Sequence, residues 1–316
     1  MDFGLPTSDF KPKLNNVKTK TMNNNNQILC FGEILWDNLP SGPVPGGAPM
    51  NVALHLSRFG ISSSVASSIG NDKKGADLVA FLKQSGLRTE LVQVHETLPT
   101  SEVLVFLDEH NTASYEICEP VAWDGITLTP ELVAEAKAST AIVFGSLASR
   151  NETSRNTLIK LLENDILKIM DVNLRPPYDT EANVKPLLEK ADIVKLNDEE
   201  LMKITGWYLL SGTLEERIIS FGRLLNLETL IVTMGKHGAY VLHKNELFQH
   251  KGFKVATEDS VGAGDAFLAG FLAAFFDGKD LNTALTEASA IGAFVASQPG
   301  ATPDYTREVI KRFIKD

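Results

Sequence analysis

The sequence is poor in cysteine and contains no long hydrophobic run, and these absences exclude several classes of protein. Cys30 and Cys118 are the only cysteines among the 316 residues, so they provide neither a disulfide framework nor the ligand spacing of a zinc site. Cys30 lies in an apolar, strand-like run, where we expect a buried free thiol. No apolar stretch has the length that a transmembrane helix needs. A reducing cytoplasm is therefore the expected compartment.

Clusters of basic residues are also absent from the sequence. The chain has 30 lysine and arginine residues against 40 aspartate and glutamate residues, which gives a formal net charge of −10. We therefore expect neither nucleic acid nor an anionic membrane as the main partner. An acidic chain can still bind a nucleotide, because backbone amides and a metal ion neutralise phosphate charge locally.

Two common nucleotide-binding signatures are missing as well. The sequence has no G-x-x-x-x-G-K-[ST], which argues against a P-loop kinase. No G-x-G-x-x-G follows the first strand-like run, which argues against a Rossmann dehydrogenase. Any nucleotide site in this chain must be built in another way.

The first 26 residues differ in composition from the rest of the chain. They carry lysines and the run Asn23 to Asn26, and they lack the apolar core of a signal peptide. We expect a disordered N-terminal tail here, with Met22 as an alternative start of translation. Residues 27–316 are expected to form one domain, since a composition that is 43% hydrophobic can bury one large core.

From residue 27 onward, short apolar runs typical of strands alternate with helical segments. Strands are predicted at Gln27–Gly32, Ala141–Gly145, Leu167–Asp171, Ile193–Leu196, Thr229–Thr233 and Ala239–His243. The predicted helices include Met50–Phe59, Gly75–Ser85 and Glu131–Lys137. This alternation predicts an α/β fold with a parallel sheet, whose ligands gather at the carboxyl ends of the strands. The polar or glycine residues expected at those ends are Asp37, Asn173, Arg175, Asn197 and Gly235.

A glycine-rich segment, Asp259-Ser260-Val261-Gly262-Ala263-Gly264-Asp265, directly precedes an apolar helical stretch. Small residues at 262–264 allow backbone N–H groups to converge at a helix N-terminus, where free donors and the helix dipole favour an anion. Asp265 would lie in the first turn, where a carboxylate can take a proton from an attacking hydroxyl group. Taken alone, the segment also fits a turn in which Asp265 only caps a helix.

A second glycine motif lies far upstream. Gly46 and Gly47 precede a helical segment with Pro49 in its first turn, where proline is tolerated. Asp37 and Asn51 flank this pair and offer the short polar side chains that recognise the vicinal hydroxyl groups of a sugar. Each of these residues taken alone also fits a turn or a helix cap.

Together the motifs resemble the ribokinase-like carbohydrate kinase family and, within it, the fructokinases. The matching motifs are G-E-x-x-x-D at 32–37, G-G-A-P-x-N-V-A at 46–53, D-x-N-x-R-x at 171–176, N-x-x-E at 197–200, T-x-G-x-x-G at 233–238 and D-x-x-G-A-G-D-A-F-x-A-G-F at 259–271. The resemblance extends from about residue 27 to the C-terminus. It implies a ribokinase-like fold, a central mainly parallel sheet flanked by helices with a small β-sheet lid, and transfer of phosphate from ATP with Mg²⁺.

The resemblance also implies a role for each matching residue. Asp265 would be the catalytic base, beside the backbone N–H groups of Gly262, Ala263 and Gly264. The residues implied in sugar binding are Asp37, Gly46, Gly47, Asn51 and Arg175. Those implied in nucleotide binding are Asn197, Glu200, Thr233, Gly235 and Gly238, with Glu200 orienting Mg²⁺ through water. For Arg175 a structural ion pair, and for Glu200 a solvated helix face, are the alternatives.

Two further features of the family have counterparts in the sequence. The strand patterns at Thr100–Leu107 and Thr112–Cys118, around the polar turn 108–111, are expected to form part of the lid, through which members of the family often dimerise. The pattern alone also fits an ordinary surface hairpin. Members also often bind a monovalent cation such as K⁺ through main-chain carbonyls, here matched by Asp259, Val261 and the loop containing Gly300. Asp304 departs from the family pattern, since ribokinases commonly have a hydroxyl residue there.

The combination of G-G-A-P-x-N with D-x-N-x-R-P favours D-fructose as the substrate and fructose 6-phosphate as the product. A 2-keto-3-deoxygluconate kinase shares the D-x-N-x-R segment and stays open as an alternative, as does a ribokinase or nucleoside kinase. A non-catalytic sugar or nucleotide sensor on the same fold is a competitor from another class. Asp265 argues against a sensor, because a protein that only binds needs no base. A homodimer is the expected assembly.

Overall fold

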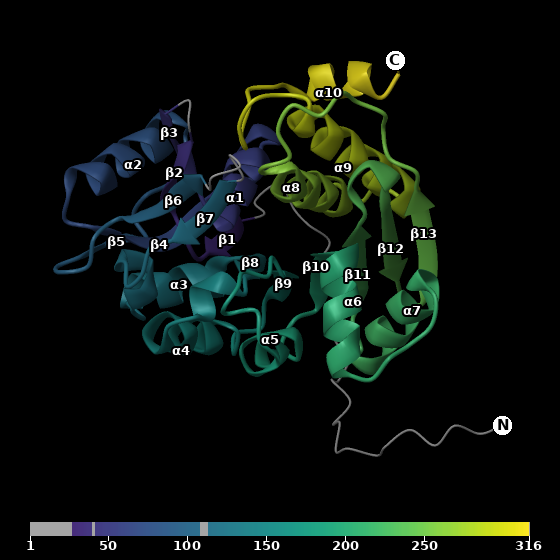
Figure 1. The fold of residues 1–316 in the computed structure, drawn as a ribbon, viewed down its shortest axis with the longest axis horizontal. Helices are drawn as coiled ribbons and strands as arrows, with labels where there is room; N and C mark the ends of the chain where they lie inside the picture. Colours follow the sequence, from purple (N-terminus) through teal and green to yellow (C-terminus); the bar gives the residue numbers. More distant parts are fainter. Residues whose placement is uncertain (1–26, 40–41, 108–112, 316) are drawn as a thin grey trace.

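The computed structural model describes residues 27–39, 42–107 and 113–315, which form a large mixed sheet covered by helices and a small second sheet (Figure 1). The order of strands is β13-β12-β11-β10-β9-β8-β1-β4-β5 in the large sheet and β3-β2-β6-β7 in the small one. The N-terminal tail expected at residues 1–26 and the polar turn at 108–111 lie outside the described residues.

The large sheet confirms the predicted mainly parallel arrangement. Its strands are β1 (Gln27–Phe31), β4 (Ser62–Gly70), β5 (Val92–His95), β8 (Ala141–Gly145), β9 (Leu167–Asp171), β10 (Ile193–Asn197), β11 (Thr229–Thr233), β12 (Ala239–His243) and β13 (Glu246–His250). Seven neighbouring strands run parallel, in the order β5, β4, β1, β8, β9, β10 and β11, whereas β12 and β13 continue the sheet antiparallel at one edge. Parallel strands are covered on both faces, which is why these strands appear in the sequence as continuous apolar runs.

Helices cover both faces of the large sheet (Figure 1). One face packs against α3 (Pro130–Ala138), α4 (Glu152–Leu161), α5 (Glu181–Leu188), α6 (Asp198–Trp207) and α7 (Leu214–Leu224). The other packs against α1 (Ala48–Arg58), α2 (Lys73–Gln84), α8 (Ala263–Phe276) and α9 (Leu281–Ala296), and α10 (Arg307–Phe313) packs against α9. Alternate residues of β1 divide between these cores: Leu29 and Phe31 face the first, and Ile28 and Cys30 the second. Cys30 is therefore a buried free thiol, as predicted.

The small sheet contains the predicted hairpin and two strands that the sequence analysis missed. The hairpin consists of β6 (Ser101–Leu107) and β7 (Ala113–Ile117), and it joins β2 (Leu35–Leu39) and β3 (Gly42–Gly46). Strand β3 could not be predicted from its sequence, G-P-V-P-G, because neither glycine nor proline is a good strand former. Both prolines are tolerated there because β3 is the edge strand of its sheet.

The position of Asp37 corrects the sequence analysis. Asp37 was expected at the carboxyl end of a strand of the large sheet, but it lies within β2 of the small sheet, opposite Val44. Strand β4 was not predicted, because its five serines resemble a loop, although all but Ser62 are buried. Among the described residues, no helix combines the length and the hydrophobicity needed to span a bilayer.

Candidate active site

The glycine-rich segment does form a tight turn into a helix, with Gly262 as the N-cap of α8. Gly262 has a left-handed φ of 74°, and a Cβ atom there would lie 2.6 Å from the main chain of Ala301. Glycine is therefore required by both the backbone conformation and the packing. The N–H groups of a first helical turn lack partners within the helix, so the start of α8 can accept an anion. The N–H of Ala263 makes one long hydrogen bond, of 3.3 Å, to the carbonyl of Ser260.

Asp265 lies in the first turn of α8 and contacts the upstream glycine motif directly. Asn51 of α1 donates from Nδ2 to Asp265 Oδ2 at 2.8 Å, across 214 residues of sequence. Asn51 is 4% exposed, and its Oδ1 has no hydrogen-bond partner in the described part of the chain. Packing of α1 against α8 thus brings the two motifs into one site.

The surroundings of Asp265 favour a carboxyl group that ionises near neutral pH. Burial and the carboxylate of Asp171 raise the pKa of Asp265 to about 6, against the opposing effects of Lys195, Asn51 and Arg175. Such a pKa suits a general base, which must be ionised at the working pH and still accept a proton.

The glycine pair of the upstream motif makes room for carbonyl and carboxylate oxygens of the chain itself. A Cβ atom on Gly46 would lie 2.1 Å from Oδ2 of Asp37, and one on Gly47 would lie 2.3 Å from the main-chain oxygen of Glu33. Gly47 also has a φ of 118°, which disfavours any other residue. Asp37 is partly buried beside this pair, and burial raises its pKa to about 6.

Glu33 belongs to the G-E-x-x-x-D motif but received no role in the sequence analysis. Its side chain is 3% exposed, and Oε2 has no partner within the described residues. Burial raises the pKa of Glu33 to about 7, and the charge of Arg175 opposes that rise. Glu33 is thus a second buried carboxyl group that acts electrostatically on Asp265.

Arg175 lies in the loop after β9 with an exposed side chain. Its Nη1 donates to the carbonyl of Leu174 at 2.9 Å, and it forms no ion pair with any described residue. Its positive charge nevertheless lowers the pKa of Asp37 and of Asp265, so the guanidinium is close enough to act electrostatically on both carboxyl groups. The alternative of a structural ion pair finds no support in these contacts.

A cavity of about 730 Å³ adjoins the α8 turn, whose residues Ala263 and Gly264 line it. It is bounded by the ends of β10 and β11, by the short helix η3 (Gly235–His237), by residues 252–257 and by α9. The residues implied in nucleotide binding that line it are Asn197, Thr233, Gly235 and Gly238, together with Ala263 and Gly264 of the turn. The residues implied in sugar binding do not line it, so the two sets meet only at the start of α8.

Glu200 does not line this cavity and is buried rather than on a solvated helix face. Its two carboxylate oxygens accept hydrogen bonds from the backbone N–H of Asn197 at 2.9 Å and of Leu174 at 2.7 Å. Asn197 Oδ1 in turn accepts from the N–H of Glu200 at 2.7 Å, which completes a capping box at the start of α6. Within the described ranges, no group of three or more His, Cys, Asp or Glu side chains is arranged to hold a metal ion.

The two segments implied in monovalent cation binding lie against each other, because Gly262 packs on Ala301. Asp259 Oδ1 accepts from the N–H of Val261 at 2.9 Å, and Gly300 has a left-handed φ of 76°. Asp304 is exposed and pairs with Arg58 at 3.2 Å.

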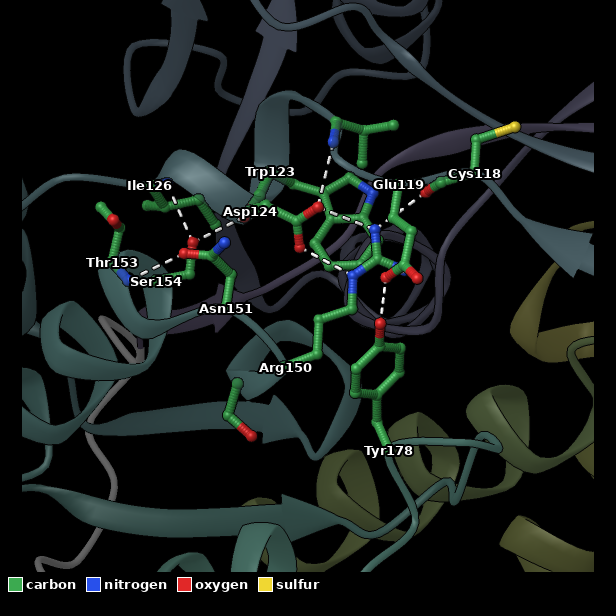
Figure 2. Close-up of polar contacts among 12 residues, drawn as sticks. Cys118, Glu119, Trp123, Asp124, Ile126, Arg150, Asn151, Thr153, Ser154 and Tyr178 are labelled. Atoms are coloured by element: carbon green, nitrogen blue, oxygen red, sulfur yellow. Dashed lines mark hydrogen bonds and ion pairs between the residues drawn. The ribbon is translucent and has the colours of Figure 1, made fainter.

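A buried arginine that was not identified from the sequence binds the chain where it leaves the small sheet after β7 (Figure 2). Arg150 is 3% exposed and binds the buried carboxylate of Asp124 through Nε and Nη2, at 2.7 and 2.8 Å. Its guanidinium lies 3.9 Å from the ring centroid of Trp123, and Nη2 donates to the carbonyl of Cys118, the residue after β7. Tyr178, close to Arg175 in the sequence, donates from its hydroxyl group to Glu119.

The sequence is similar to those of known carbohydrate kinases. Residues 42–307 match the family model described as pfkB family carbohydrate kinase. Fructokinase-2 of Solanum lycopersicum is 28% identical over 305 residues, which cover 87% of this chain and 92% of the relative.

Solved structures share the fold. Fructokinase from Vibrio cholerae O395, in its fructose, ADP and calcium ion bound form, superimposes with a TM-score of 0.79 at 24% identity and covers 92% of this chain and 100% of its own. Aminoimidazole riboside kinase from Salmonella enterica, complexed with aminoimidazole riboside and an ATP analog, gives a TM-score of 0.75 at 21% identity, with coverage of 92% and 100%. At these identities the likeness establishes the fold.

Proposed function

Because the chain belongs to the pfkB family of carbohydrate kinases, we propose that it is a fructokinase, which transfers the γ-phosphate of ATP to the terminal hydroxyl group of D-fructose. The observation that carries the proposal is the hydrogen bond between Asn51 and Asp265. It joins the group that would hold a sugar hydroxyl to the group that would deprotonate it. A protein that only binds sugar has no need of this pairing.

The sugar would lie between the small sheet and the start of α8. Asp37 and the unpartnered Oδ1 of Asn51 would accept hydrogen bonds from its hydroxyl groups, and Arg175 would donate to its oxygens. Gly46 and Gly47 would keep this side of the site free of side chains. The small sheet would act as the lid, since β2 carries Asp37 and pairs with the predicted hairpin.

Asp265 would accept the proton of the sugar hydroxyl as that oxygen attacks the γ-phosphorus of ATP. A pKa of about 6 keeps the carboxylate ionised at neutral pH. The N–H groups of Gly262, Ala263 and Gly264 would stabilise the charge on the transferring phosphoryl group. The chemistry then depends mainly on positioning, because phosphoryl transfer requires little covalent work from the protein.

ATP would occupy the cavity beside α8, whose volume of about 730 Å³ suits a nucleotide. Asn197, Thr233, Gly235 and Gly238 would contact it. Mg²⁺, which neutralises phosphate charge, would be held through water by Glu200, since each of its oxygens accepts one backbone hydrogen bond and keeps a second lone pair. A monovalent cation would bind main-chain carbonyls of Asp259, Val261 and Gly300, where the two segments pack together.

A homodimer through the small sheet and a cytoplasmic location complete the proposal. Both described cysteines are free, as expected in a reducing compartment. Leu104 of β6 exposes 36% of its surface on the small sheet and would lie in the dimer contact.

A panel of sugars assayed with Mg-ATP tests the proposed substrate. We expect the highest kcat/KM for fructose, ahead of 2-keto-3-deoxygluconate, ribose and nucleosides. A higher value for 2-keto-3-deoxygluconate would replace the substrate and keep the kinase chemistry. Absence of phosphorylation of every sugar would favour a sensor.

The variant Asp37→Ala tests the sugar site within the same assay. Loss of a buried hydrogen-bonding group costs about 1 to 3 kcal/mol, so we expect the fructose KM to rise roughly 5- to 150-fold while the ATP KM stays within about twofold. Asp77→Ala, on the exposed surface of α2, is the matched control and should change neither value. Equal increases in both KM values would remove Asp37 from the sugar site.

A further inference from the structure

Lys195 is a buried lysine within an otherwise apolar strand, and its charged end lies against the α8 turn. The side chain is 9% exposed, and a Cβ atom on Gly264 would lie only 2.9 Å from Nζ. The ammonium group donates to both carboxylate oxygens of Asp171, at 2.9 and 2.8 Å. Lys195 and Asp171 are cross-strand neighbours in β10 and β9, so the register of the sheet holds the pair in place.

This arrangement is unfavourable in the protein without a ligand. Burial of an ion pair removes both charges from water, and the attraction between them offsets that cost only partly. A cation beside a helix N-terminus is also repelled by the positive end of the helix dipole. An anion bound at the turn would offset this repulsion, because both the helix N-terminus and the ammonium group of Lys195 would attract it.

We propose that Lys195, held by Asp171 against the first turn of α8, is a positioning residue for phosphoryl transfer that keeps the neighbouring Asp265 ionised. The inference rests on the proposed role of Asp265 as the base and is independent of which sugar is bound. Lys195 attracts the proton-free, negative form of Asp265, whereas Asp171 repels it, and the repulsion is the larger of the two effects. Burial raises the pKa of Asp265 most, and the pair adjusts the pH above which the base is active.

The other charged groups around Asp265 are Glu33, which follows β1, and Arg175, in the loop after β9. Glu200 of α6 acts on Lys195, whose pKa its negative charge helps to raise. Burial alone would lower the pKa of Lys195, but the carboxylates of Asp171 and Asp265 raise it above its usual value. Lys195 thus stays charged over the whole range in which Asp265 titrates.

The test removes each charge of the pair separately in the full-length chain. Lys195→Met should move the titration of Asp265 to higher pH, and Asp171→Asn should move it to lower pH, each by about 1 unit. The double variant should titrate between the two. Lys195→Arg retains the charge and should stay closer to wild type than Lys195→Met. Lys168→Met is the matched control, because Lys168 lies at the opposite end of β9 and bonds the carbonyl of Ile166.

Two readouts follow the titration. The first is the carboxyl ¹³C resonance of Asp265 in aspartate-labelled protein without substrate, assigned by its absence in Asp265→Asn. The second is the acid limb of kcat/KM with the best sugar of the panel. Opposite displacements in the two single variants support the proposal. Displacement in the same direction, or none, overturns it, and the NMR readout gives this result even if fructose is not the substrate. If Lys195→Met does not fold, the direction of the shift in Asp171→Asn decides.

Discussion

At the scale of single residues, Asp265 carries both the proposed chemistry and a cost in stability. Its carboxylate accepts a hydrogen bond from Asn51, and burial raises its pKa to about 6, above the usual value of 3.8. A folded-state pKa above that of the unfolded chain means that ionisation destabilises the fold. This cost is absent below about pH 4, grows as the pH rises, and is complete above about pH 6.

Asp265→Asn should therefore lose activity and gain stability at neutral pH. We expect kcat to fall about 10²- to 10⁴-fold, as for the loss of a general base. The free energy of unfolding should rise by about 1 to 3 kcal/mol at pH 7.5, and this gain should disappear as the pH falls towards 4. Steady-state kinetics and urea unfolding at several pH values measure both effects.

Asp277→Asn is the control on the same helix, because Asp277 is exposed at the C-terminal end of α8. It should change neither kcat nor the pH dependence of stability. A folded Asp265→Asn protein with near-normal kcat would contradict the assignment of the base.

At the scale of elements, Arg150 joins the small sheet to the large one (Figure 2). It binds Asp124 and the carbonyl of Cys118, where the chain leaves β7. Through Glu119 and Tyr178, the same cluster reaches the loop that carries Arg175. One buried guanidinium therefore connects the segment after β7 of the small sheet to the loop that carries Arg175.

Arg150→Met should destabilise the protein strongly, because it leaves the carboxylate of Asp124 buried without a partner. We expect a loss of about 3 to 5 kcal/mol in the free energy of unfolding. The double variant Arg150→Met with Asp124→Asn should recover part of this loss, since no charge is then unpaired. Lys160→Met, in an exposed pair with Glu163, should cost less than about 1 kcal/mol. If Arg150→Met lowers the free energy of unfolding by no more than Lys160→Met does, the cluster around Arg150 is solvated.

At the scale of the whole molecule, the small sheet ends in two edge strands, β3 and β7, each of which has only one neighbouring strand among the described residues. Unpaired edge strands are prone to pair with other chains, and a dimer contact is one way to cover them. The proposed homodimer would use this surface.

Light scattering should give a molar mass near twice the 34.5 kDa of one chain. Leu104→Glu should shift the protein towards a single chain, because it places a charge in the proposed contact. Leu209→Glu is the matched control, since Leu209 is 91% exposed after α6, away from the small sheet. A wild-type mass of one chain, or an unchanged mass for Leu104→Glu, would refute a dimer through the lid.

The sequence by itself determined the parallel core of the fold and the turn into α8. Strands β8, β9, β11 and β12 begin and end where the apolar runs do, because a strand buried on both faces needs apolar side chains along its whole length. The turn at Gly262 could also be predicted from local sequence, because few residues other than glycine adopt a left-handed φ.

Only the tertiary structure decided which polar groups meet. The pairing of Lys195 with Asp171 depends on the register of β9 and β10, and the contact of Asn51 with Asp265 on the packing of α1 against α8. Strand β3 forms only because β2 offers it a partner, against the preferences of its own residues. A lysine in the apolar run Ile193–Leu196 was the one local signal of the buried pair, and Arg150 had none. Such groups are stabilised by partners far away in the chain, so their burial cannot be read from their neighbours in sequence.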